Sequence, residues 1–266
     1  MTLKPGRELV RATLAAILRR TPLGLWPVRV RRGIAAGARW TLFPWSSYWR
    51  GTYEPEVQEV LARLGNGRIE GWNCWDLGAH FGLYSVGLAR RVGPGGQVAA
   101  FEPNPLSFQR LARHRRMNRL SWLKIYPFAA SASSGEAELF TYGDLGSTTT
   151  HLPHDGEART DDIAPVVVRK VRLDDLVANG ELRLPQFVKI DVEGHGHRAL
   201  AGMRKTLAAT RPLIVAALHT PDEIQGMQAE LEPFGYSWLR LDGTPAATIQ
   251  SGKDYLLTPR VPAPGN

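Results

Sequence analysis

The sequence predicts an α/β fold in which a mostly parallel seven-stranded sheet has helices on both faces and ends in an antiparallel hairpin. From Asn73 onward, short apolar runs alternate with longer segments that follow helical spacing, which is the pattern of a parallel sheet crossed by helices. After Gly235, two apolar runs are joined by a turn that contains Gly and Pro, with no helix between them. Strands connected in this way pair antiparallel, so we expect a hairpin at the sheet edge.

Each element is predicted from its own pattern, and turn residues mark where it ends. Thr21-Pro22 ends a first helix near 10–18, and Gly65-Asn66-Gly67 ends a second over 56–64. Strands of the sheet are expected over 73–77, 97–102, 123–128, 187–191, 212–218, 236–241 and 254–258, with a further strand at 136–142. The remaining helices are expected near 83–91, 105–117, 197–209 and 222–232. Residues 143–165 predict a long loop, which is typical of a lid, a substrate contact or disorder.

The positive charge of the chain is concentrated at its start. Of the 266 residues, which carry a net charge of +8, the first fifty contain ten Lys and Arg and one acid, Glu8, so the rest is nearly neutral. We therefore expect a basic leader or helical cover over 1–50 and a main domain over 51–266. The neutral main domain argues against a nucleic-acid partner. The leader either contacts anionic membrane or a phosphorylated substrate, or packs over the cleft with its arginines in water.

The cellular location is predicted from what the sequence lacks. The single cysteine, Cys74, excludes a disulfide framework and falls in a strand, where a buried inert thiol is expected. No segment reaches 18 apolar residues, and Arg19-Arg20 closes the apolar stretch 12–18 without a signal-peptide cleavage site. We expect a cytoplasmic protein that can lie against the inner face of the membrane through its leader. Its oligomeric state is not predicted.

Two neighbouring strands end in residues that suit a nucleoside. The run Trp-Asp-Leu-Gly-Ala-His-Phe-Gly at 75–82 reads as a strand that opens into a glycine turn, and the next strand ends in Glu102. An acid at that place suits a bidentate hydrogen bond with ribose hydroxyls. The D-x-G-x-x-x-G spacing differs from the G-x-G-x-x-G that binds a pyrophosphate. A nucleoside with an amino-acid tail and no phosphates, S-adenosylmethionine, fits better.

Several blocks of the sequence together carry a family resemblance. They are Asp76–Gly82, Gly93–Gly96, Phe101–Pro105, Val171–Leu176 and Lys189–Gly194, preceded by Gly51-Thr52-Tyr53-Glu54-Pro55. In this order they resemble the FkbM-type family of S-adenosylmethionine-dependent methyltransferases, over roughly residues 50–258. The resemblance implies a Rossmann-like class I methyltransferase fold. It also implies methyl transfer to an oxygen of a sugar, a glycolipid or a natural product.

The glycine turn and the strand ends give the expected cofactor contacts. Gly78 and Gly82 would let the backbone pass the methionine portion, whose carboxylate would face the amides after Gly82. Asp76 would bond loop amides or the cofactor's ammonium, and Glu102 the ribose. Pro103 and Asn104 would flank one side of the adenine, and Ala129 and Ala130 the other. The full predicted set is Asp76, Gly78, Ala79, His80, Gly82, Tyr84, Glu102, Pro103, Asn104, Ala129 and Ala130.

The catalytic candidates lie where two further strands end. A hydroxyl is a poor nucleophile, so its proton needs a base or its pKa needs a metal. Asp191 and Glu193 end the strand at 187–191, and His219 follows the strand at 212–218. We predict all three as catalytic, with Asp191 as the base; the alternative for Asp191 is a structural bond to a loop amide.

Other polar residues near these strands are given simpler roles. His195 and His197 are expected to be exposed at a helix start, and Asp174 to cap a helix. Two positions depart from the family: His80 stands where members often have Asn, and Ala216 or Ala217 where the fifth strand often ends in an acid. Without that acid, an essential divalent metal is not favoured.

Two other function classes remain open from the sequence. A nucleic-acid or protein methyltransferase is suggested by the net charge, but the strand at 187–191 lacks the Asn-Pro-Pro-Tyr-like block that binds an amino nitrogen. A non-catalytic nucleoside-binding module is disfavoured by the intact glycine turn and Glu102. The acceptor itself, a small molecule or a carbohydrate or lipid-linked compound, is not specified by the sequence.

Overall fold

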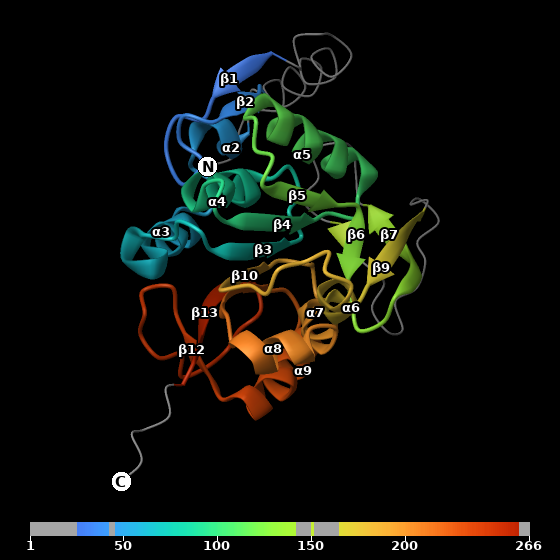
Figure 1. The fold of residues 1–266 in the computed structure, drawn as a ribbon. Helices are drawn as coiled ribbons and strands as arrows, with labels where there is room; N and C mark the ends of the chain where they lie inside the picture. The colour runs from blue at the N-terminus through green and yellow to red at the C-terminus, as the bar shows by residue number, and fades with distance from the viewer. Residues whose placement is uncertain (1–25, 43–45, 142–149, 152–164, 261–266) are drawn as a thin grey trace, which may run out of the picture.

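The computed structural model describes residues 26–42, 46–141, 150–151 and 165–260, and its centre is one seven-stranded sheet (Figure 1). The strands are β3 (Asn73–Leu77), β4 (Gln97–Phe101), β5 (Leu123–Tyr126), β10 (Phe187–Ile190), β11 (Leu213–Leu218), β12 (Tyr236–Leu239) and β13 (Lys253–Pro259). Their order is β12-β13-β11-β10-β3-β4-β5. β13 pairs antiparallel with both of its neighbours, β11 and β12, and the other neighbouring strands of the sheet pair parallel. The predicted parallel sheet with a C-terminal hairpin is confirmed.

Helices cover both faces of this sheet, as predicted (Figure 1). One face carries α3 (Pro55–Arg63), α4 (Leu83–Val92) and α5 (Pro105–Met117); the other carries α6 (Leu173–Ala178), α7 (Gly196–Ala201), α8 (Arg204–Thr210) and α9 (Pro221–Leu231). Single 3-10 turns, η2 (Leu64–Gly67) and η3 (Glu232–Phe234), follow α3 and α9. Successive strand residues point to opposite faces, so Cys74 joins the apolar cluster under α4 and Trp75 the cluster under α7 and α9.

A smaller sheet beside β5 was only partly predicted. It consists of β6 (Phe128–Ala130), β9 (Val166–Val171), β7 (Gly135–Thr141) and β8 (Thr150–His151), in that order. The strand expected at 136–142 is β7, whereas β9 was missed because it follows directly on the expected loop 143–165. Most of that loop lies outside the described residues, so its role stays a prediction. The small sheet brings Ala129 and Ala130 to the end of β4.

Where the structure describes residues 26–50, several of their side chains are buried in the main core, whereas others, such as Trp26, are exposed. Predicted as part of a basic leader or helical cover, these residues form β1 (Pro27–Arg29) and β2 (Arg39–Thr41), which pair antiparallel, and the short helix α2 (Ser47–Arg50). Trp40, 1% exposed, stacks on the His114 ring of α5 with ring centroids 3.6 Å apart. The helix expected near 10–18 lies outside the described residues. Within the described part of the chain, no helix is long and apolar enough to cross a membrane.

His114 is held as a neutral imidazole inside this core. Its Nε2 accepts the backbone N–H of Thr41 at 3.2 Å, so its Nδ1 carries the proton and donates to the carbonyl of Phe81 at 2.7 Å. Burial lowers the pKa of His114 to about 3. The contact joins β2, α5 and the turn before α4.

Two expectations on the second face need correction. The helix expected at 197–209 is two helices, α7 and α8, which are separated by Gly202 and by the non-helical backbone of Met203 (φ −128°, ψ 24°). At Gly202 an added Cβ would lie 2.1 Å from the carbonyl oxygen of Ser131. Asp174 is a helix cap, as expected, but it caps α8 rather than its own helix. Its carboxylate accepts the backbone N–H groups of Lys205 and Thr206 at 2.8 and 3.0 Å.

Candidate active site

A cavity of about 260 Å³ opens at the carboxyl ends of β3, β4, β10 and β11, where ligands of open α/β sheets bind. Of the residues predicted from the sequence, those that line it are Gly78, Ala79, His80, Tyr84, Glu102, Pro103, Ala129, Ala130, Asp191, Glu193 and His219. Phe101, Phe128 and Leu139 add an apolar wall. Asp76, Gly82 and Asn104 are not among the described lining residues. The structure thus brings most of the predicted set together.

Glu102 is buried at the end of β4 and fixes the glycine turn. One carboxylate oxygen accepts the backbone N–H of His80 at 2.7 Å, and the other accepts that of Asn104 at 2.8 Å. Burial raises the pKa of Glu102 to about 7, although both backbone hydrogen bonds act to lower it. Each oxygen has a further lone pair for a donor from the cavity.

The glycines of the turn are required by the fold itself. Gly78 has φ +82°, and an added Cβ would lie 1.8 Å from the carbonyl oxygen of Asp191. Gly82 has φ +86°, and its Cβ would lie 2.4 Å from Cδ1 of Leu111. Asn104 caps α5 through hydrogen bonds from two backbone N–H groups. Their predicted contacts with the cofactor stay predictions.

Asp76 is fully buried behind the glycine turn, and one of its oxygens accepts the hydroxyl of Ser85 at 2.5 Å. Its predicted contact with the cofactor's ammonium stays a prediction. Burial raises the pKa of Asp76, and the ammonium of Lys189 acts in the opposite direction. The register pairs these two residues directly, Asp76 on β3 and Lys189 on β10.

Lys189 is a buried cation that the sequence analysis did not assign to the site. Its Nζ lies 2.9 Å from Oδ2 of Asp191 and 4.8 Å from the centre of the Tyr84 ring. Burial alone would lower the pKa of Lys189, but the charges of Asp191, Asp76 and Glu54 raise it. A charged lysine in an apolar strand run was the signal for this role, since a buried lysine needs carboxylate partners.

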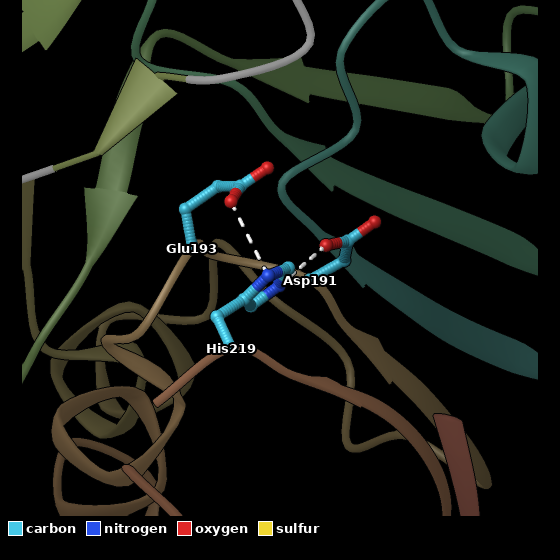
Figure 2. Close-up of side chains that lie close together, drawn as sticks. All are labelled: Asp191, Glu193 and His219. Atoms are coloured by element: carbon cyan, nitrogen blue, oxygen red, sulfur yellow. Dashed lines mark hydrogen bonds and ion pairs between the residues drawn. The ribbon is translucent and has the colours of Figure 1, made fainter. Parts of the chain in front are cut away.

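The three catalytic candidates form one cluster (Figure 2). The His219 ring lies between two carboxylates, with Nε2 3.1 Å from Oδ1 of Asp191 and Nδ1 3.3 Å from Oε2 of Glu193. Burial would lower the pKa of His219, but its hydrogen bond to Asp191 and the charge of Glu193 raise it to about 9. Burial acts to raise the pKa of Asp191, yet Lys189 and His219 hold it well below its usual range. At neutral pH this arrangement contains an imidazolium between two carboxylates.

A buried carboxylate behind the cluster fixes its backbone. Glu223, on α9, accepts the N–H of Gly196 at 2.8 Å through Oε1 and the N–H of His219 at 2.7 Å through Oε2. It therefore connects the turn that carries Glu193 to the end of β11. His195, expected to be exposed, is only 3% exposed because this turn packs against α9, where an added Cβ on Gly196 would lie 2.6 Å from the sulfur of Met227.

Three residues before β3 complete the cavity wall, and the sequence analysis did not assign them to the site: Tyr48, Tyr53 and Glu54. Tyr84 donates to Oε2 of Glu54 at 2.5 Å, and the Tyr48 hydroxyl lies 2.9 Å from Nδ1 of His80. Asp254 also lines the cavity. Burial, followed by the charge of Glu54, raises the pKa of Asp254 to about 6. The Tyr53-Glu54 part of the family lead-in was the available signal.

The sheet order, the glycine turn held by Glu102 and the cavity at the strand ends are those of a class I methyltransferase. The model of the methyltransferase FkbM domain matches residues 76–239. The chain belongs to the FkbM methyltransferase family.

Two named relatives are similar to the chain in sequence, and one solved structure superposes on it. The chain is 27% identical over 178 residues to hexuronic acid methyltransferase AglP of Haloferax volcanii, covering 67% of this chain and 69% of that protein. It is 28% identical over 182 residues to 31-O-demethyl-FK506 methyltransferase FkbM of Streptomyces tacrolimicus, covering 57% and 67%. The solved structure of a methyltransferase FkbM from Methylobacillus flagellatus superposes with a TM-score of 0.49 at 19% identity, over 74% of this chain and 46% of that one.

Proposed function

We propose that this protein transfers the methyl group of S-adenosylmethionine to a hydroxyl oxygen of a sugar, a glycolipid or a natural product. The observation that carries the proposal is a cavity with two chemically different ends. One end has Glu102 beside an apolar wall, which suits ribose and adenine; the other has the cluster of Asp191, Glu193 and His219. The names of the two relatives, one acting on a hexuronic acid and one on a 31-O-demethyl compound, support an oxygen acceptor.

The proposed cofactor position follows the residues at the strand ends. Glu102 accepts the ribose hydroxyls, and the adenine lies between Pro103 and the pair Ala129 and Ala130. The methionine portion passes Gly78, with its carboxylate toward the amides at the start of α4. The sulfonium methyl then faces the end of β10.

Methyl transfer in this position is an in-line displacement that depends on positioning. The acceptor oxygen bonds the methyl carbon as the carbon–sulfur bond breaks, the electron pair passes to sulfur, and the hydroxyl proton leaves. Asp191 is the proposed base and first hydrogen-bond acceptor for that hydroxyl. Because Lys189 holds the pKa of Asp191 low, Asp191 is always ionised but is a weak base. Aiming the hydroxyl is thus its larger contribution.

The charge of the cavity bears on the acceptor. Among the described lining residues, the carboxylates outnumber the cations: Glu54, Glu102, Asp191, Glu193 and Asp254 stand against Lys189, Lys253 and the imidazolium of His219. An excess of negative charge repels a polyanion. This favours a neutral hydroxyl compound over a nucleic acid.

Binding and transfer can be tested in sequence. Calorimetry with S-adenosylhomocysteine should give a micromolar-range Kd, and tight binding of NAD instead would overturn the cofactor assignment. Methyl transfer from labelled S-adenosylmethionine should then be measured on sugars, uronic acids, glycolipids and natural-product alcohols, with an oligonucleotide and a basic peptide as comparisons. Transfer only to the oligonucleotide or the peptide would contradict an oxygen acceptor.

Contact of residues 1–50 with anionic membrane, which would bring the site to a lipid-linked acceptor, is the second part of the proposal. It is supported by the ten positive charges against one negative charge in this segment; each contributes about 1 kcal/mol near an anionic surface. Replacing Lys4, Arg7, Arg11, Arg19 and Arg20 by Gln should abolish co-sedimentation with phosphatidylserine vesicles at low salt. Equal sedimentation of variant and wild type would contradict it. Deletion to residue 50 is unsuitable, because it removes the buried Trp40.

A further inference from the structure

The cluster of Asp191, Glu193 and His219 has the dimensions of a metal site. One ligand atom from each residue lies within 4.8 Å of the other two. Around an octahedral ion with bonds of about 2.1 Å, ligand atoms are about 3.0 Å apart when adjacent and about 4.2 Å when opposite. The three side chains are 21–27% exposed, so they face the cavity rather than the open surface (Figure 2).

We propose that Asp191, Glu193 and His219 bind one divalent cation, Mn²⁺ or Mg²⁺, and that the ion holds the acceptor oxygen beside the cofactor methyl. The role of the ion rests on the proposed function, whereas its binding does not. A cation at this place lowers the pKa of a bound hydroxyl. Asp191 alone is a weak base and accepts the hydroxyl proton poorly.

Charge balance supports an ion here. When the ion displaces the proton of the His219 imidazolium, two carboxylates and a neutral imidazole together compensate a divalent cation. Asp191 can bind the ion through Oδ1, which faces His219, while Oδ2 stays paired with Lys189 at 2.9 Å.

The backbone behind the ligands is already fixed, as a metal site requires. Glu223 is 0% exposed and hydrogen-bonds the N–H groups of Gly196 and His219. Groups of this kind orient metal ligands and add to affinity. The sequence did not favour a metal because β11 lacks an acid, but the turn after β10 supplies Glu193 to the same place.

The donor set indicates which ion to use as a probe. Carboxylate oxygens suit Mg²⁺ and Mn²⁺, and an imidazole nitrogen favours Mn²⁺ of the two. MnCl₂ should be titrated into the full-length chain after EDTA treatment and desalting. Binding is followed by calorimetry and by loss of the electron paramagnetic resonance signal of free Mn²⁺. The expected Kd is about 0.1 mM or tighter. Bound Mn²⁺ should also show a nitrogen coupling from the imidazole.

Matched variants separate coordination from general negative charge. Glu193→Gln and His219→Gln should each weaken Mn²⁺ at least about tenfold, and His219→Gln should remove the nitrogen coupling. Asp254→Asn, which removes a carboxylate in the same cavity outside the cluster, should change the Kd by less than about threefold, because the ion's ligands remain. Thermal unfolding of each variant verifies folding.

Two results would overturn the proposal. One is wild-type binding no tighter than that of the His219→Gln variant, and the other is Asp254→Asn weakening Mn²⁺ as much as Glu193→Gln. S-adenosylhomocysteine binding is measured on the same samples. If it persists without Mn²⁺ binding, the metal proposal fails while the methyltransferase function stands.

Discussion

Replacing Glu102 by Gln tests the cofactor site with a change of one atom. In the wild type each carboxylate oxygen accepts one backbone N–H, at 2.7 and 2.8 Å, and offers one more lone pair to the cavity. Gln keeps one acceptor oxygen, so it loses one charge-assisted hydrogen bond to the ribose and one of the two backbone hydrogen bonds that hold the turn. Such a bond contributes about 1.5–3 kcal/mol, which predicts a roughly 10- to 150-fold weaker Kd for S-adenosylhomocysteine.

The pH dependence gives the same prediction a second measurement. The pKa of Glu102 is about 7, and the ionised form binds the ribose hydroxyls, so affinity should fall as pH decreases through 7. From pH 8 to pH 6 the ionised fraction decreases about tenfold, and the affinity should decrease by about the same factor. In Glu102→Gln this contribution should vanish.

The assay is calorimetry with S-adenosylhomocysteine at pH 6, 7 and 8 on wild type, Glu102→Gln and Glu181→Gln. Glu181 is exposed and outside the cavity lining, so its replacement should leave the affinity unchanged. Denaturant unfolding of Glu102→Gln should stay cooperative. Wild-type affinity in Glu102→Gln, or a pH dependence that persists in it, would refute the assignment.

Three further predictions follow from the geometry. Asp191→Asn should leave S-adenosylhomocysteine affinity within about threefold and reduce initial rates of methyl transfer by roughly 10²–10⁴; rates near wild type would contradict its catalytic role. Gly82→Ala should lower the free energy of unfolding by about 2–4 kcal/mol in urea titrations, because alanine disfavours the left-handed backbone at this position and its Cβ would clash with Leu111. The control Gly71→Ala has the same backbone cost, at φ +79°, but no atom within 4 Å, so it should lower the free energy of unfolding by only about 1–2 kcal/mol. The pKa of His114 is lowered to about 3 in the folded protein, so the stability that the neutral imidazole contributes is present above the unfolded pKa near 6.5 and is lost as pH falls. Between pH 7 and pH 5 the free energy of unfolding should decrease by about 2 kcal/mol from this group. Urea titrations of His114→Gln should lack this decrease.

The fold was predictable because its signals are local. Each strand of the main sheet is an apolar run bounded by Gly, Pro or a polar cluster, and the missing helix before β13 specifies the hairpin. The break between α7 and α8 was not predictable in this way. At the break Gly202 lies against the carbonyl of Ser131, a contact across 71 positions of sequence that no helical pattern contains.

The candidate site was predictable to the extent that strand ends select it. Asp191 and His219 follow adjacent strands, so their proximity follows from topology. By contrast, Glu193 reaches His219 through a turn with φ +49° at Glu193, and Lys189 is paired by the register of β10 with β3. Tyr48 comes from the segment that was read as a separate leader, and its position depends on the packing of β1 and β2.

The contact of Gly78 with the Asp191 carbonyl joins two loops that are far apart in sequence, one with the proposed cofactor contacts and the other with the proposed acceptor contacts. No side chain separates them, so neither backbone can be displaced without the other. An effort to change acceptor specificity should leave Gly78 and Asp191 unchanged. It should instead vary Ala217, Lys253 and Asp254, which line the cavity from β11 and β13. Libraries built there would alter what is methylated while the methyl donor keeps its place.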